Sequence, residues 1–183
     1  MSATPSKMVA LGTAAPDFAL PEVATGAAIS LADFAAGQPL LVMFLSRHCP
    51  YVQHVQQELA ALGRDYKARA AMVAISSNDA AAYPEDAPAR LRAMAREQGF
   101  TFPFCHDESQ TAARAYGAAC TPDFFLFDSA RKLAYRGQLD DSRPGNGRPV
   151  TGRDLRAALD ALLAGRPVAA EQRPSLGCNI KWR

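Results

Sequence analysis

The chain lacks a long hydrophobic run, a strong excess of charge and any closely spaced pair of cysteines. Its longest apolar run, residues 39–45, is far shorter than the roughly 18 residues that a membrane-spanning helix needs. Lys and Arg number 20 and Asp and Glu 18, so the net charge of +2 predicts no general attraction to nucleic acid or to a membrane surface. The first residues do not show the pattern of a signal peptide, and we therefore expect a cytoplasmic protein.

The four cysteines, at positions 49, 105, 120 and 178, include no Cys-x-x-Cys motif. This spacing argues against a structural zinc site and against the dense disulfide framework of small secreted domains. The better interpretations are reactive thiols or small buried side chains.

The length and composition are those of one globular domain. The chain has 183 residues, of which 49% are hydrophobic and 21% charged. We therefore expect a single domain over residues 1–183. Its last part, residues 166–183, is expected to be a tail that is too polar and too rich in proline to extend the preceding helix.

Hydrophobic periodicity predicts strands that alternate with helices. A small hairpin is expected within residues 15–31, where Ser30 would cap a short helix. Strands are expected at residues 40–45, 71–76, 102–105, 124–127 and 132–136. Helices are expected at about 50–67, up to Gly99, at 109–116 and from about 151 to Gly165. This order predicts a mixed sheet with helices on both faces.

The strongest local feature is Cys49, which stands between a buried strand and the first turn of a helix. Pro50 suits the first helical position, so the free N–H groups of the helix end would face the sulfur. The helix dipole would stabilise a thiolate by roughly 0.3 to 1 kcal/mol. Arg47 or His48 could add a cation, and Ser46 could donate a hydrogen bond to the sulfur. The alternative is a buried cysteine that only caps the helix.

A second feature precedes the strand at residues 124–127. Pro122 is suited to the start of a strand because it cannot donate a hydrogen bond to a neighbour. From the residues alone the Thr121–Pro122 bond would be trans, since only about 5 to 6% of such bonds are cis.

These two features, with the matching segments around them, resemble the peroxiredoxin-like redoxins of the alkyl hydroperoxide reductase and thiol-specific antioxidant superfamily, often labelled thioredoxin family proteins. The segments are residues 15–18, 48–52, 120–128, 140–146 and 174–182. The resemblance implies an α/β thioredoxin-like fold with a mixed central sheet and an N-terminal β-hairpin extension. It also implies a cis bond before Pro122.

The resemblance implies roles for individual residues. Cys49 matches both the first cysteine of the thioredoxin motif and the peroxidatic cysteine of peroxiredoxins, and Ser46 matches the hydroxyl position of the latter. Val52 stands at the second thioredoxin cysteine and Val42 at the peroxiredoxin proline, so neither motif is complete. The main chain at Thr121 and Pro122 would bind an extended substrate segment.

The function predicted is that of a thiol-dependent oxidoreductase with antioxidant activity, in which the Cys49 thiolate attacks a disulfide or a peroxide. It would need no cofactor and no metal, and a thioredoxin-like protein or glutathione would reduce it. His48, and Arg143 in a loop that the fold places near the corner, are further substrate-binding candidates. The rival hypotheses are a metal-binding protein that uses Cys49 and histidines, and a binding module without turnover.

The partner of an oxidised Cys49 is expected elsewhere in the chain or in another molecule. The resemblance places Cys120 on the loop that faces the nucleophile, and Cys120 is therefore the expected partner and third catalytic candidate. Cys178, on the tail, and an external thiol such as glutathione are the competitors. A disulfide requires Cα atoms within about 7 Å.

Overall fold

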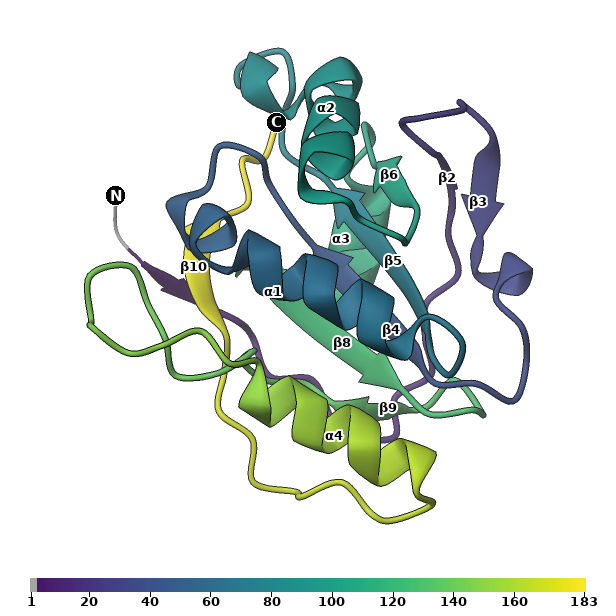
Figure 1. Cartoon of the computed structure of the whole chain (residues 1–183). Coiled ribbons are helices and arrows are strands. Elements are labelled where there is room, and N and C mark those ends of the chain that lie inside the picture. Colours follow the sequence, from purple (N-terminus) through teal and green to yellow (C-terminus); the bar gives the residue numbers. More distant parts are fainter. Residues whose placement is uncertain (1–2) are drawn as a thin grey trace.

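A mixed five-stranded sheet forms the centre of the protein (Figure 1). The structure is a computed structural model that describes residues 3–183. Across the sheet the strands are β6 (Phe104–His106), β5 (Ala71–Ser76), β4 (Leu40–Phe44), β8 (Asp123–Phe127) and β9 (Leu133–Tyr135). Strands β4, β5 and β6 are parallel, and β8 pairs antiparallel with β4 and β9. The apolar run that predicted a central strand is β4, which is buried along its whole length.

Helices cover both faces of this sheet. One face packs against α1 (Pro50–Tyr66), α2 (Pro88–Gln98) and α4 (Arg153–Leu163), and the other against α3 (Thr111–Tyr116). Alternate residues of β4 serve the two layers, because successive side chains of a strand point to opposite faces. Leu41 and Met43 face α1, whereas Val42 and Phe44 face α3. The predicted mixed sheet with helices on both faces is confirmed.

The predicted hairpin is formed by β2 (Ala19–Pro21) and β3 (Ala28–Ser30), which pair antiparallel. A single 3-10 turn, η1 (Leu31–Asp33), follows β3 where a short helix was expected. The carboxylate of Asp33 accepts a hydrogen bond from the main-chain N–H of Ser30 at 2.7 Å and holds this turn. A second 3-10 turn, η2 (Pro84–Asp86), lies in the polar loop before α2.

The C-terminal tail differs most from the prediction. It carries a strand, β10 (Leu176–Asn179), which lies between β1 (Thr4–Pro5) and β7 (Cys120–Thr121). Figure 1 shows β10 passing the N-terminal end of α1. Strand β10 and its two neighbours are each only a few residues long. A strand this short leaves no long apolar pattern in the tail sequence. Its pairing comes from distant segments, which local periodicity does not report.

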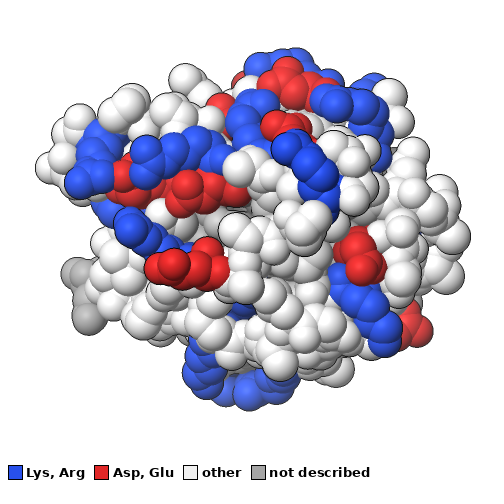
Figure 2. Space-filling model, turned by 90° about the horizontal axis from the view of Figure 1, so that it is seen from below, with Lys and Arg blue, Asp and Glu red and all other residues white. Residues whose placement is uncertain are grey.

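Charged side chains of both signs are interspersed on the face shown in Figure 2. Ion pairs on α4 and the preceding loop include Arg148 and Arg153 with Asp141, and Arg156 with Glu58. This mixture agrees with the small net charge. Among the helices of residues 3–183, none has the length and apolar character needed to cross a membrane.

Candidate active site

Cys49 occupies the N-cap position of α1, and four residues separate it from the end of β4. Pro50 begins the helix, where its missing N–H costs no hydrogen bond. The main-chain carbonyl of Cys49 accepts a helical hydrogen bond from Gln53 at 3.0 Å. The position predicted for this cysteine is therefore correct. Its side chain, however, is 0% exposed, because other segments cover it.

Two groups touch the sulfur of Cys49. Cys178 Sγ lies 2.8 Å away, and the main-chain oxygen of Thr121 lies 3.1 Å away and accepts a hydrogen bond from the thiol. Both come from the small sheet formed by β1, β10 and β7. The nucleophile candidate thus faces a second cysteine, on a strand of its own chain.

Strand β10 lies very close to the chain just before Pro122. In the antiparallel register, Cys178 pairs with Thr121 and Asn179 with Cys120. A Cβ atom added at Gly177 would lie 1.9 Å from the carbonyl oxygen of Thr121, so this position accommodates only glycine without a shift of the main chain. The Thr121–Pro122 bond is cis, in agreement with the expectation from the resemblance.

The expected pairing of Cys49 with Cys120 needs correction. Thr121 directs its carbonyl at Cys49, and the Cys120 sulfur lies 3.7 Å from the main-chain oxygen of Pro122. Cys178 holds the contact that was assigned to Cys120, because β10 joins β7 and carries its cysteine opposite Thr121.

The environments of the thiols differ. Burial raises the pKa of Cys120, and the nearby Asp123 carboxylate raises it further. Burial and the adjacent Cys49 sulfur raise the pKa of Cys178. Cys105, in β6, has a pKa raised to about 12 by burial and packs in the apolar layer that faces α3.

A buried carboxylate organises the corner before Cys49. Asp86, at the end of η2, is 0% exposed and accepts hydrogen bonds from Ser46 Oγ at 2.9 Å and from Arg47 N at 2.6 Å. Its other partners are His48 Nδ1 at 2.8 Å and Asn78 Nδ2 at 2.7 Å. One side chain therefore holds three consecutive residues of the corner.

This arrangement changes the roles expected for Ser46 and His48. The hydroxyl group of Ser46 has a single proton, and it is donated to Asp86 in place of the expected bond to the Cys49 sulfur. The ring of His48 stacks on Tyr83, with centroids 5.3 Å apart, while its Nδ1 is held by Asp86. Ser46 and His48 thus position the main chain around Cys49.

The same network reaches the tail. Asn78, which donates to Asp86, also accepts a hydrogen bond from the main-chain N–H of Lys181 at 2.8 Å. Gln110 Nε2 donates to the carbonyl oxygen of Lys181 at 2.8 Å. Lys181 lies three residues after Cys178. The segment that carries Cys178 is therefore connected to the corner through two side chains, Asn78 and Asp86.

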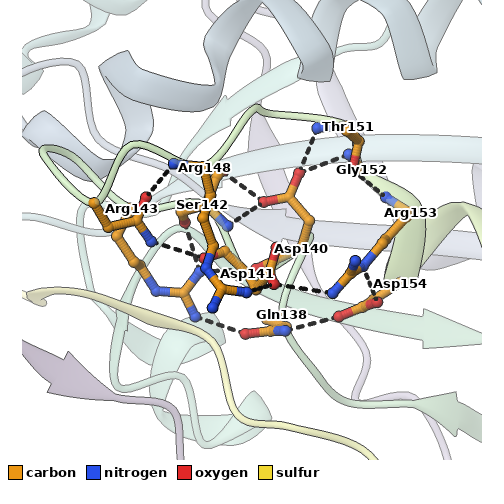
Figure 3. Close-up of polar contacts among 11 residues, drawn as sticks. Gln138, Asp140, Asp141, Ser142, Arg143, Arg148, Thr151, Gly152, Arg153 and Asp154 are labelled. Atoms are coloured by element: carbon orange, nitrogen blue, oxygen red, sulfur yellow. Dashed lines mark hydrogen bonds and ion pairs between the residues drawn. The ribbon is translucent and has the colours of Figure 1, made fainter.

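Arg143 lies in the loop before α4, whose residues are linked to one another by hydrogen bonds (Figure 3). Its guanidinium group donates to the main-chain oxygens of Asp140 and Ser142 and to Gln138 Oε1, at 2.7, 2.6 and 2.6 Å. Arg143 and Pro122 line the same cavity of about 20 Å³, roughly the space of one water molecule. The loop does lie near Pro122, as expected, but the guanidinium is already used within it.

A buried ion pair supports the other side of Pro122. Asp123, the first residue of β8, accepts two hydrogen bonds from Arg136, one of them from Nη2 at 3.0 Å. Both side chains are 0% exposed. The guanidinium carbon of Arg136 lies 3.8 Å from the centre of the Phe125 ring. This pair stabilises the start of β8, and with it the position of the Thr121 carbonyl.

The residues that sequence reasoning missed are Asp86, Asn78 and the pair of Asp123 with Arg136. A polar residue in a loop, such as Asp86, is common in any sequence, and nothing in the sequence shows that the folded loop will bury it. The three histidines lie apart, with His48 at the corner, His54 in α1 and His106 at the end of β6. Across residues 3–183, no cluster of three or more His, Cys, Asp or Glu side chains could hold a metal ion.

Comparison with known proteins places this geometry in a wider group. The family model described as AhpC/TSA matches residues 11–136. A solved structure of an uncharacterized conserved protein from Geobacillus kaustophilus is 53% identical, with a TM-score of 0.97, and the match covers 100% of this chain and 97% of that one. A hypothetical protein from Sinorhizobium meliloti is 51% identical, with a TM-score of 0.96 and 98% of each chain covered.

More distant structures share the fold. A thiol:disulfide interchange protein of the thioredoxin family from Chlorobium tepidum is 18% identical, with a TM-score of 0.64. That match covers 85% of this chain and 99% of the other. The thioredoxin-like fold expected from the sequence is therefore confirmed. No curated protein gives a significant match.

Proposed function

The chain belongs to the AhpC/TSA family, and on this basis we propose that it is a thiol-dependent oxidoreductase with antioxidant activity, in which Cys49 is the nucleophile and Cys178 the resolving thiol. The observation that carries the proposal is the 2.8 Å contact between the two sulfurs. A disulfide bond is about 2.05 Å long. Only a small shift of β10 toward α1 is needed to form it.

The surroundings of the two sulfurs support this division of roles. Cys49 is the N-cap residue of α1, where the helix dipole favours an anion, and its side chain makes no capping hydrogen bond to the first turn. Burial and the adjacent Cys49 sulfur raise the pKa of Cys178, which favours its thiol form. We therefore assign the attacking thiolate to Cys49 and the waiting thiol to Cys178.

With a peroxide, the Cys49 thiolate would attack one oxygen atom and break the O–O bond. The other oxygen leaves as an alkoxide or hydroxide and takes up a proton, and Cys49 becomes a sulfenic acid. The Cys178 sulfur then attacks the Cys49 sulfur. The hydroxyl group leaves as water with the Cys178 proton, and a disulfide joins the two residues.

With a disulfide substrate, the Cys49 thiolate would attack one sulfur, and the other would leave as a thiolate that takes up a proton. Cys178 would then attack Cys49 and release the substrate as a dithiol. In both cases the product is a disulfide between Cys49 and Cys178. A thioredoxin-like protein or glutathione in the cytoplasm would supply the two electrons that reduce it.

Peptide mapping tests the pairing. The reduced protein is treated with one equivalent of hydrogen peroxide, digested without reductant and mapped by mass spectrometry. We expect a peptide that links Cys49 to Cys178, and Cys120→Ser, a matched control in the adjacent strand, should leave its yield unchanged. Recovery of Cys178 as a free thiol while Cys49 is disulfide-linked would contradict the proposal.

Stopped-flow mixing tests the class of reaction. The reduced protein is mixed with hydrogen peroxide and, separately, with a mixed disulfide. The reaction that clearly exceeds the rate of a free cysteine peptide identifies the oxidant, and Cys49→Ser should abolish both. If neither reaction exceeds that rate, the fold serves as a binding module without turnover, and the proposal is wrong.

A further inference from the structure

His48, the residue directly before Cys49, is placed to serve the leaving group of the reaction. When the Cys49 sulfur attacks a peroxide or a disulfide, the second oxygen or sulfur departs with a negative charge. An alkoxide or an alkyl thiolate leaves slowly unless an acid supplies a proton as the bond breaks. The acid needed here is a side chain beside Cys49 that both gains and loses a proton.

The ring of His48 is held at one nitrogen and at one face. Its Nδ1 lies 2.8 Å from a carboxylate oxygen of Asp86, and the ring stacks on Tyr83 with the two planes 7° apart. Asp86 also accepts hydrogen bonds from three other residues, as an ionised carboxylate does, so Nδ1 is the nitrogen that donates. The neutral ring therefore has one orientation and carries its proton on Nδ1.

The second ring nitrogen of His48, Nε2, is left for chemistry. Because the two nitrogens of an imidazole point in diverging directions, Nε2 faces away from Asp86. The side chain of His48 is 20% exposed and that of Asp86 is 0% exposed, so the ring extends from a buried carboxylate to the surface. Such a ring accepts a proton at Nε2, and the buried carboxylate stabilises the cation that forms.

The cations next to His48 are engaged in other contacts. Arg47 forms an ion pair with Glu85, and a guanidinium group does not give up its proton in proteins. The amino group of Lys181 donates to the main-chain oxygen of Asn179 at 2.9 Å and lies 5.8 Å from the centre of the Tyr83 ring. The imidazole is thus the group at this corner that is suited to carry a proton.

We propose that His48 is a catalytic residue, which supplies the proton to the group that leaves when Cys49 attacks its substrate. This inference rests on the proposed function and adds a proton carrier to it. The leaving atom stands one bond beyond the atom that Cys49 attacks, so its acid lies beside the Cys49 sulfur and not in contact with it. A long side chain on the adjacent residue meets this requirement.

The protons balance within the corner. Nε2 takes up the proton that the Cys49 thiol loses, directly or through one water molecule, and the ring becomes a cation beside Asp86. Cys49 then forms its S–O or S–S bond while the O–O or S–S bond of the substrate breaks. Nε2 passes the same proton to the leaving oxygen or sulfur, which departs as water, an alcohol or a thiol, and His48 is neutral again.

Oxidants whose leaving groups differ in their need for a proton test this role. Every protein in the test carries Cys178→Ser, so that only the first attack by Cys49 is followed. Peracetic acid releases acetate and dithiobis-nitrobenzoate releases thionitrobenzoate, and both leave without a proton. tert-Butyl hydroperoxide releases an alkoxide and hydroxyethyl disulfide an alkyl thiolate, and both need one. Quenched-flow mass spectrometry of the whole protein gives the rate at which Cys49 is modified.

His48→Asn keeps a side-chain N–H for Asp86 but has no group that carries a proton. Within the class of oxidant that the parent reduces, we expect it to slow the reaction with the poor leaving group at least about tenfold, and that with the good leaving group less than about threefold. His48→Phe, which keeps a ring against Tyr83, should show the same selectivity and serves if the first variant does not fold. His54→Asn, which changes the histidine within α1, should leave all rates unchanged.

Equal slowing with good and poor leaving groups would overturn the inference, because His48 would then only position the corner. Unchanged rates with the poor leaving groups in the His48 variants would overturn it as well, as would the same selective slowing in His54→Asn. A parent Cys49 that reacts with none of the four oxidants would instead contradict the proposed function, on which this inference depends.

Discussion

Two buried carboxylates, Asp123 and Asp86, hold the segments around Cys49 and are hydrogen-bonded in different ways. Asp123 is paired with the guanidinium group of Arg136, and both side chains are 0% exposed. Asp86 is equally buried, but its donors are a hydroxyl, a main-chain amide, a histidine ring and a side-chain amide. One site is an ion pair to which the main-chain N–H of Ala119 adds a hydrogen bond, and the other is a set of separate hydrogen bonds without a guanidinium group.

The two carboxylates therefore have different structural roles: Asp123 holds one strand in place, whereas Asp86 connects two segments. The pair of Asp123 with Arg136 cannot be partly broken without leaving a buried charge, so it holds the start of β8 in one place. The donors to Asp86 come from two segments, and one of them, Asn78, continues to the tail at Lys181. A change in the tail can therefore reach the Cys49 corner through Asp86 while the sheet stays intact.

The largest effect is expected from breaking the ion pair. Arg136→Met leaves the Asp123 carboxylate buried without its cation and should lower the free energy of unfolding by about 3 to 5 kcal/mol. Guanidinium denaturation followed by circular dichroism measures it. Adding Asp123→Asn to this variant should restore part of the loss, since the unpaired charge is then gone. A double variant no more stable than Arg136→Met alone would contradict this account.

A smaller effect on stability, with an effect on reactivity, is expected at the second carboxylate. Asp86→Asn replaces one acceptor oxygen with an NH2 donor, so some of the buried donors around it lose their acceptor. The free energy of unfolding should fall by about 1 to 3 kcal/mol. The corner and the tail should loosen together, so Cys49 should be alkylated faster by iodoacetamide. Asp107→Asn is the control, because Asp107 is also buried and bonded to Ser77 and to Ala113. Equal acceleration in both variants would show that Asp86 has no special connection to Cys49.

A third carboxylate sharpens the comparison through pH. Burial alone would raise the pKa of Asp140, but hydrogen bonds from Ser142, Gly152 and Thr151 lower it below its ordinary value. A carboxyl group with a lowered pKa stabilises the folded state above the pKa of the unfolded chain, and this contribution is lost as the pH falls through the folded value. Asp140→Asn should therefore lower the free energy of unfolding by about 1 kcal/mol at pH 7. Below about pH 4 the variant should lose less stability with falling pH than the parent protein does. Unfolding curves between pH 2 and pH 7 test this, and equal slopes for both proteins would refute it.

The smallest effect is expected at the surface. Asp141 forms ion pairs with Arg148 and Arg153, whose side chains are about 60% exposed. Solvent screens such pairs, so Asp141→Asn should leave the melting temperature unchanged within error, both at low salt and in 1 M NaCl. A clear destabilisation that disappears at high salt would mean that this network supports the loop more strongly than its exposure indicates.

The parts of the molecule that sequence predicts well are those with local signals. The stripe of Val52, Val55, Leu59 and Leu62 predicted α1, and Pro50 marked its start, so the position of Cys49 followed from neighbouring residues. Gly99 and Gly117 end α2 and α3 in the left-handed conformation that glycine adopts without strain. The resemblance to a family added the cis bond and the overall fold.

The parts that were missed depend on contacts between distant segments. Cys178 lies 129 positions from Cys49, and Asp86 lies 40 positions from Ser46. A short strand in a polar tail and one acidic residue in a loop have no periodicity that could reveal them. Gly177 was the available signal, since a glycine directly before a cysteine suggests close main-chain approach, but only the structure identifies Thr121 as its neighbour.

The sulfur contact also bears on permanent damage. A sulfenic acid has two fates: capture by a thiol, which is reversible, or a second encounter with peroxide, which gives a sulfinic acid. Capture by Cys178, 2.8 Å away, is unimolecular, whereas over-oxidation becomes faster as peroxide accumulates. Under the proposed function, the protein should therefore keep its activity at peroxide concentrations that would inactivate a peroxidase with a distant resolving thiol. It should lose activity only where over-oxidation of the Cys49 sulfenic acid becomes faster than formation of the bond to Cys178.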